Sequence, residues 1–365
     1  MLKKMAIGIA VAALTATAFQ VQVNAQQGGA AAPAPARRAV GATIGNGPGY
    51  PTDEQFKDSK EAQALVVKAK GIAGNDPILK SRWDKSCTVL GPQRAAVLRQ
   101  NAGLPAEPQK IVEPVKIFDN LYFFGYNSIG AWAIPTSQGI LMIDSLNNEM
   151  EAETIIEPAL KKVGLNPADV KTIIVGHGHF DHFGGAPYFQ KKYGTHIVMS
   201  KVDWDMIEKP NPNARGPQAN RPLPKRDVEV VSDGQKITLG DETITLYITP
   251  GHTPGSLAYI IPVKEHGKAM NIMMLSGANI TPDRESLVAF QKALDAAKAA
   301  KVQALINGHP GLFGDEVGWM EQVRANPNGP NPFVMTQGQF GKFIDIMKDC
   351  AEARVVAMDY KGATN

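Results

Sequence analysis

Histidine and cysteine are both scarce in this chain, with 7 and 2 copies among 365 residues. Two cysteines are too few for the disulfide framework of a small secreted domain, and they do not lie at the spacing of a zinc-ligand pair. Either one disulfide between Cys87 and Cys350 or two free buried thiols agrees with this count. Because histidine is so rare, a cluster of histidines is improbable by chance and deserves a chemical explanation.

A large excess of one charge is also absent. The formal net charge is +3, and two of the positive residues, Lys3 and Lys4, lie at the very start of the chain. A chain so close to neutrality has no electrostatic reason to bind nucleic acid. Hydrophobic residues make up 44% and charged residues 20% of the chain, which is typical of a globular protein with a substantial core.

Long hydrophobic runs are absent beyond the first 25 residues. Met5 to Phe19 is apolar but short for a transmembrane helix, and the small-residue sequence Val23-Asn24-Ala25 follows it. This pattern predicts a signal peptide over residues 1–25, with an uncleaved anchor as the alternative. The mature protein is then expected in the periplasm, without stable membrane insertion. Residues 26–51 are rich in Ala, Pro and Gly and are predicted to form a disordered leader.

The scarce histidines gather at one place. Residues 177–182 read His-Gly-His-Phe-Asp-His, and the β-branched run Ile173-Ile174-Val175 leads directly into them. Such a run predicts a buried strand, and a turn after it would bring Asp181 and His182 back over the two earlier histidines. Three imidazoles and a carboxylate at a strand end are ligands that suit zinc or another divalent first-row metal.

This pattern resembles the metallo-β-lactamase superfamily, whose signature is His-x-His-x-Asp-His after a core strand. Two further family motifs follow, Gly-His-Thr-Pro-Gly-Ser at 251–256 and Asn-Gly-His-Pro-Gly at 307–311. The resemblance covers residues 111–320 and implies an α/β fold, the αββα sandwich. Residues 52–110 and 321–365 lie outside it and are expected to be helical N- and C-terminal extensions. The helices are predicted by a capping-box pattern at Thr52 and Gln55 and by apolar residues at helical spacing from 340 to 347.

The resemblance also implies two zinc ions per chain. The ligands of the first ion would be His177, His179 and His252, and those of the second Asp181, His182 and His309. A hydroxide bridging the two ions would be the nucleophile of a hydrolase that acts on a small-molecule substrate.

One departure from the family pattern narrows the range of expected substrates. Thioesterases, glyoxalase II enzymes and many lactonases of the superfamily carry a bridging Asp where Ala278 stands in this sequence. The remaining ligand pattern is closest to subclass three of the metallo-β-lactamases, which implies β-lactam ring opening. The alternatives are a zinc hydrolase that acts on a non-lactam ester, a halogenated or an aromatic compound, and a non-catalytic metal-binding scaffold. Asp181, Ser276 and Asn279 are the residues expected to orient water or substrate.

Several segments around the expected site also carry predictions. Asp144, at the end of a strand, is either a buried carboxylate close to the metal ligands or a simple strand cap. Residues from Pro210 to Pro224 include five prolines and are predicted to form a binding loop or lid, with a disordered insert as the alternative. Trp204 is expected in a short helix before this loop, and the segment from Trp204 to Pro224 is expected to flank the mouth of the site. The C-terminal helix is expected to pack on the sandwich, and a homodimer contact is the alternative.

Overall fold

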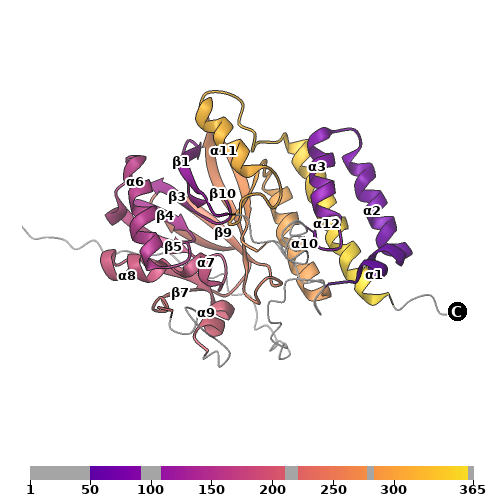
Figure 1. Ribbon diagram of the computed structural model, residues 1–365, viewed down its shortest axis with the longest axis horizontal. Helices are drawn as coiled ribbons and strands as arrows, with labels where there is room; N and C mark the ends of the chain where they lie inside the picture. Colours follow the sequence, from indigo (N-terminus) through magenta and orange to yellow (C-terminus); the bar gives the residue numbers. More distant parts are fainter. Residues whose placement is uncertain (1–49, 92–107, 210–220, 278–282, 361–365) are drawn as a thin grey trace, which may run out of the picture.

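The computed structural model describes residues 50–91, 108–209, 221–277 and 283–360 (Figure 1). The expected signal peptide (1–25), the leader as far as residue 49, most of the proline-rich loop and Asn279 lie outside these ranges. Among the described residues, no helix is long and apolar enough to cross a membrane.

Seven strands form the first sheet, in the order β1-β2-β3-β4-β5-β6-β7. Their bounds are β1 (Ile111–Phe118), β2 (Leu121–Tyr126), β3 (Gly130–Thr136), β4 (Gly139–Ile143), β5 (Val170–Ile174), β6 (His196–Ser200) and β7 (Val228–Val230). Strands β1 to β4 form an antiparallel meander, and β4 to β7 pair in parallel. The apolar sequence of β5 suits a parallel strand that is covered on both faces.

Five strands form the second sheet, in the order β12-β11-β10-β9-β8. Their bounds are β8 (Gln235–Leu239), β9 (Glu242–Ile248), β10 (Leu257–Glu265), β11 (Lys268–Leu275) and β12 (Leu305–Asn307). Strands β8 to β11 are antiparallel neighbours, and β12 joins β11 in parallel. The register places the end of β12, which leads to the third motif, beside the end of β11 at Leu275 and Asn307.

The two sheets face each other across a shared core that includes Phe123, Trp132, Ile174 and Tyr259. Helices cover the outer face of each sheet (Figure 1). On the first sheet lie α5 (Glu149–Glu151), a π-helical turn (Ala152–Ile156), α6 (Glu157–Lys162) and α8 (Ala186–Tyr193), and on the second lies α10 (Arg284–Ala299). A 3₁₀ turn (Pro167–Asp169) precedes β5. The predicted αββα sandwich is confirmed.

The terminal helices form a further layer outside α10 (Figure 1). They are α1 (Asp53–Asp58), α2 (Lys60–Ala73), α3 (Pro77–Ser86) and α12 (Gln337–Asp359). The capping box at Thr52 is present, but the helix breaks at Ser59, whose hydroxyl accepts a hydrogen bond from the Ala62 N–H and starts α2. A disulfide joins Cys87 at the end of α3 to Cys350 in α12, so the disulfide alternative holds.

One helix links the sandwich to the C-terminal region. α11 (Glu316–Ala325) runs past residue 320, and its residues Met320 and Val323 belong to the core between the two sheets. Phe333 lies in the same core. The inter-sheet core therefore draws on residues beyond the segment that resembles the family.

Candidate metal centre

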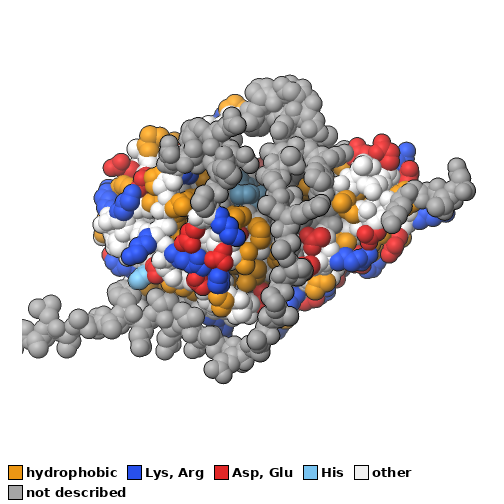
Figure 2. All heavy atoms as spheres, turned by 90° about the horizontal axis from the view of Figure 1, so that it is seen from below, with side chains coloured by type: hydrophobic (Ala, Val, Ile, Leu, Met, Phe, Trp, Pro, Cys, Tyr) orange, Lys and Arg blue, Asp and Glu red, His pale blue; other side chains and the backbone are white. Residues whose placement is uncertain are grey.

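The three motifs meet because each follows the end of a strand or hairpin at one edge of the sandwich. β5 ends at Ile174, and the backbone turns into the short helix α7 (Phe180–Phe183), so His177 and His179 precede this helix while Asp181 and His182 lie in it. His252 lies in the connection between β9 and β10, and His309 follows β12. In the space-filling view of this side, a histidine surface lies recessed among hydrophobic side chains (Figure 2).

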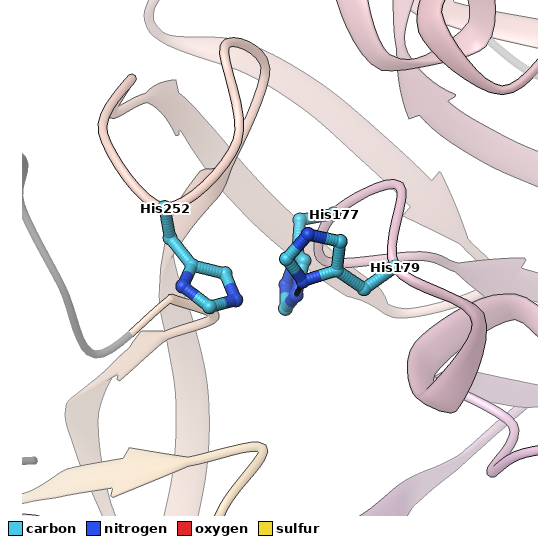
Figure 3. Close-up of side chains that lie close together, drawn as sticks. All are labelled: His177, His179 and His252. Atoms are coloured by element: carbon cyan, nitrogen blue, oxygen red, sulfur yellow. Dashed lines mark hydrogen bonds between the residues drawn. The ribbon is translucent and has the colours of Figure 1, made fainter. Parts of the chain in front are cut away.

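His177, His179 and His252 form the first group of potential ligands. One ligand atom from each lies within 4.8 Å of the others, and His177 Nε2 is 3.2 Å from His179 Nδ1. Figure 3 shows the three imidazoles turned toward a common space, with His252 approaching from the opposite side to His177 and His179. The structure thus brings together the three residues predicted to hold the first ion.

Asp181, His182 and His309 form the second group. His182 Nε2 is 3.1 Å from His309 Nε2. Asp181 Oδ2 lies 3.8 Å from the first of these nitrogens and 3.6 Å from the second. His182 is fully buried, whereas the side chains of Asp181 and His309 are 24% and 27% exposed, so this group opens toward solvent.

These distances fit zinc. Two ligand atoms about 2.0–2.1 Å from a tetrahedral zinc ion are about 3.4 Å apart. The separations of 3.1, 3.2 and 3.6 Å lie close to that value. The His182 and His309 pair needs a cation most clearly. Asp144 and the Ser128 carbonyl oxygen accept the Nδ1 protons of these two residues, so both Nε2 atoms carry lone pairs and would repel each other at 3.1 Å without a cation between them. The donor set therefore suits one ion in each group.

Groups behind the imidazoles fix which nitrogen faces the centre. Asp144 Oδ2 is 2.7 Å from His182 Nδ1, and the Ser128 carbonyl oxygen is 2.7 Å from His309 Nδ1. Each of these acceptors holds the proton on Nδ1, which leaves the Nε2 lone pair free for a metal. Asp144 is completely buried, and its Oδ1 accepts a hydrogen bond from the Gly176 N–H at 2.8 Å.

Asp144 also has an unusual backbone conformation. Its φ of +61° lies in the left-handed region, which costs energy for a residue other than glycine and is least costly for Asp and Asn. Gly308 packs against the same pair, because a Cβ at that position would lie 2.9 Å from His182 Cε1 and 3.1 Å from Asp144 Oδ2. Of the two interpretations of Asp144, the buried carboxylate close to the ligands agrees with this geometry.

The protonation of the histidines also favours metal binding. Burial lowers the pKa of His177 and His252 well below the usual value, and it lowers the pKa of His179 to about 4. Burial lowers the pKa of His309 as well. His182 differs, because burial lowers its pKa but the Asp144 and Asp181 carboxylates together raise it by more. Four of the five imidazoles are therefore neutral at pH 7 and present free lone pairs.

One buried carboxylate that the sequence did not suggest connects two of the motifs. Asp203, in α9 (Lys201–Ile207), accepts hydrogen bonds from the Gly178 N–H at 2.7 Å and the Gly255 N–H at 2.8 Å. The Thr253 hydroxyl donates to the same carboxylate at 2.6 Å. Burial raises the pKa of Asp203 to about 6, against the lowering effect of these donors. Asp203 therefore ties the loop of His177 and His179 to the loop of His252.

The remaining predicted residues have mixed outcomes. The Ser276 hydroxyl lies 2.9 Å from His177 Nδ1 and is fully buried, so it contacts a ligand imidazole. Asn279 lies outside the described residues. The prediction that Trp204 lies at the mouth of the site is wrong, because its side chain is buried in the core and its Nε1 donates to the Val228 carbonyl oxygen.

Comparison with known proteins agrees with this geometry. Residues 129–265 match the family described as the metallo-β-lactamase superfamily. A curated N-acyl homoserine lactonase of Bacillus sp. is 26% identical over 166 residues, which cover 39% of this chain and 61% of that protein. A probable polyketide biosynthesis zinc-dependent hydrolase of Bacillus velezensis is 27% identical over 118 residues, which cover 32% of this chain and 45% of that protein. The chain thus spans less than two thirds of the length of these relatives.

Solved structures extend the similarity over more of the chain. BJP-1, a subclass B3 metallo-β-lactamase of Bradyrhizobium japonicum, is similar to this chain with a TM-score of 0.52 and 27% identity. The similarity covers 64% of this chain and 89% of BJP-1. The similarity therefore spans most of BJP-1 and leaves about a third of this chain outside it.

Proposed function

Because this chain contains a metallo-β-lactamase superfamily domain, we propose that the protein is an exported zinc-dependent hydrolase that holds two zinc ions and opens the ring of a β-lactam. The observation that carries the proposal is the convergence of all six potential ligands at one edge of the sandwich. In the second group the ligand atoms of Asp181, His182 and His309 lie within 3.8 Å of one another. A scaffold that only needed these residues for packing would not leave imidazole lone pairs facing each other.

Zinc ions held there would supply a water of lowered pKa and a positive charge for the anion that develops on the substrate. The chain supplies the positioning. Asp144 and Ser128 hold His182 and His309 in fixed orientations. Burial raises the pKa of Asp181, but His182 and His309 lower it by more, so this carboxylate is ionised at neutral pH. Asp181 can therefore accept a hydrogen bond from the attacking water and aim it at the substrate.

Two features support a β-lactam as the substrate. The similarity to BJP-1 reaches 27% identity over 89% of that β-lactamase. The sequence also has Ala278 where many lactonases of the superfamily have a bridging Asp. The second candidate is hydrolysis of a lactone or another ester, and the curated relatives named as N-acyl homoserine lactonases favour it.

Export is part of the proposal. The start of the chain has Lys3 and Lys4, a short apolar run and Val23-Asn24-Ala25, as in a cleaved signal peptide. The disulfide between Cys87 and Cys350 requires an oxidising compartment, and the periplasm is one. N-terminal sequencing of periplasmic protein should give a chain that begins at Gln26. A full-length chain in the membrane fraction would contradict cleavage.

Metal analysis tests the core of the proposal. We expect two zinc ions per chain in the wild type and one in His182→Ala, because this variant removes a ligand of the second group alone. His196→Ala is the matched control, since His196 pairs with Asp227 at the surface and should keep both ions. A purified wild type that carries no zinc, iron or manganese would refute the proposal.

A further inference from the structure

Arg221 lies against the metal-binding motif itself. Its guanidinium carbon is 3.7 Å from the centre of the Phe180 ring, and Phe180 is the residue between His179 and Asp181. Arg221 Nη1 also donates a hydrogen bond to the Asn147 carbonyl oxygen at 2.9 Å. Asn147 belongs to the turn that follows Asp144. The guanidinium is thus fixed in place by two segments that build the second ligand group.

The described part of the chain provides no ion-pair partner for Arg221. Among the described residues, no carboxylate lies within 4.0 Å of this guanidinium, and the Asn147 carbonyl is its one hydrogen-bond acceptor. The Glu151 carboxylate is near enough to act on Arg221, but it already accepts hydrogen bonds from the Asn147 and Asn148 side chains. Asp181 also acts on Arg221 and belongs to the ligand set. Most of the guanidinium N–H groups therefore remain available.

Arg226, in the same region, differs from Arg221 because carboxylates occupy its guanidinium. Its guanidinium donates to Asp205 and Glu208 at 2.8 Å and to Glu229 at 2.7 Å. Three carboxylates thus neutralise Arg226, whereas Arg221 lies over an aromatic ring and, within the described ranges, donates only to the Asn147 carbonyl oxygen. The Arg221 guanidinium carbon lies over the face of the Phe180 ring, and the N–H groups of a guanidinium can pair with a carboxylate through two parallel hydrogen bonds.

We propose that Arg221 binds a carboxylate carried by the substrate, on the side of the centre formed by Asp181, His182 and His309. This inference rests on the proposed hydrolase function and adds the substrate class, an anionic molecule. The Phe180 ring and the Asn147 carbonyl oxygen hold the guanidinium beside the motif. The substrate's carboxylate would pair with the remaining N–H groups while its scissile bond lies over the ligand groups. A purely structural role for Arg221 would instead leave the protein indifferent to the charge of a bound molecule.

Binding of two small thiols distinguishes these roles without catalysis. Mercaptoacetate and mercaptoacetamide share the thiol, which binds zinc, and differ in the charge of the other end. Calorimetry on the zinc-loaded protein should show mercaptoacetate binding at least about tenfold more tightly than the amide, since a charge-assisted bidentate pair is worth one to two powers of ten. Arg221→Met should bring the ratio close to one, and Arg221→Lys should restore part of it. Arg226→Met, the matched control, should keep the wild-type ratio.

The outcomes separate this inference from the function on which it rests. If both thiols bind and the ratio is unchanged in Arg221→Met, the role of Arg221 is refuted and the metal centre stands. If Arg221→Met weakens both thiols equally, Arg221 only shapes the motif, and the inference is again refuted. If neither thiol binds the zinc-treated wild type, the proposed metal centre fails and the inference fails with it. Zinc content equal to wild type in Arg221→Met shows that the comparison is made on an intact site.

Discussion

The Asp203 carboxylate accepts a hydrogen bond from the Thr253 hydroxyl at 2.6 Å, although the two residues lie 50 positions apart in the chain. The same carboxylate accepts hydrogen bonds from the Gly178 and Gly255 backbone N–H groups. Thr253 and Gly255 follow His252, and Gly178 separates His177 from His179. The distance between the two loops that carry the first ligand group is therefore set by one buried acid.

Asp203→Asn should weaken both the fold and the first metal group. The amide has one acceptor oxygen and no charge, so at least one buried N–H loses its partner, at a cost of about 2–3 kcal/mol in the free energy of unfolding. Zinc affinity of the first group should fall about 10- to 100-fold, as is usual when a group behind the ligands is lost. Urea denaturation and zinc titration measure the two effects.

Asp205→Asn is the control for this variant. Asp205 lies in the same helix, but its partners are Lys201 and Arg226 at the surface. Its replacement should change the free energy of unfolding by less than about 1 kcal/mol. If Asp203→Asn behaves like Asp205→Asn in both measurements, Asp203 does not position the loops.

Asp144→Asn should act on the second ion alone. Asparagine tolerates the positive φ of this position, so the backbone should keep its conformation and only the charge is lost. Without the carboxylate the Nδ1 proton of His182 is held less firmly, and zinc affinity of the second group should fall about 10- to 100-fold. Competition with a chromophoric chelator, which resolves the two binding steps, measures this. An equal loss at both steps, or no loss, would be the contrary result.

The metal-free protein should lose stability as the pH falls from 7 to 5. The pKa of His179 is about 4 in the folded protein, below the usual 6.5, and the pKa values of His177, His252 and His309 are also lowered. At a pH between the folded and unfolded pKa values of these histidines, the unfolded chain binds more protons than the folded chain. Their contribution to the free energy of unfolding is therefore present above pH 6.5 and is lost on acidification.

Four groups oppose this trend in the metal-free protein. The pKa of His182 is raised, that of Asp203 is raised to about 6, and burial raises the pKa values of Glu242 and Glu265, so these groups contribute stability that is lost as the pH rises through their folded values. The histidine shifts are the larger ones, because the pKa values of His177 and His252 lie well below the usual value and that of His179 is about 4. Thermal melts after chelation should therefore give a lower midpoint at pH 5 than at pH 7, and a higher midpoint at pH 5 would contradict the direction of these shifts.

The disulfide between Cys87 and Cys350 should stabilise the outer helical layer. It closes a loop of 263 residues and joins α3 to α12. Replacing both cysteines with serine should lower the free energy of unfolding by about 2–4 kcal/mol, which urea denaturation measures. Zinc content should not change, because no ligand lies in this layer. An unchanged denaturation midpoint would mean that the layer is held by packing alone.

The convergence of the six potential ligands could be expected from the sequence because four of them lie within six consecutive residues after an apolar strand. The spacing of these four residues indicates a metal site, and the two later motifs, which are weak signals alone, become specific once the first motif is present. The sandwich followed from the same resemblance. The disulfide remained one of two alternatives, because the proximity of Cys87 and Cys350 depends on how the terminal helices pack.

Asp203 and Arg221 could not be predicted in this way. Their partners are backbone groups, a hydroxyl and an aromatic ring that lie at least 25 residues away in the sequence, so no local spacing marks them. Trp204 was assigned wrongly to the mouth because a tryptophan in a short helix gives the same sequence pattern whether it faces solvent or the core. Only packing against the first sheet decides that it is buried.

Hydrolysis of a chromogenic cephalosporin tests the central claim most directly. The zinc-loaded wild type should open the ring, a strong chelator should abolish the activity, and added zinc should restore it. His252→Ala should lower the rate by orders of magnitude because it removes a ligand of the first group. Protein that carries two zinc ions and shows no measurable turnover of any β-lactam would contradict the account and direct attention to lactones and other esters.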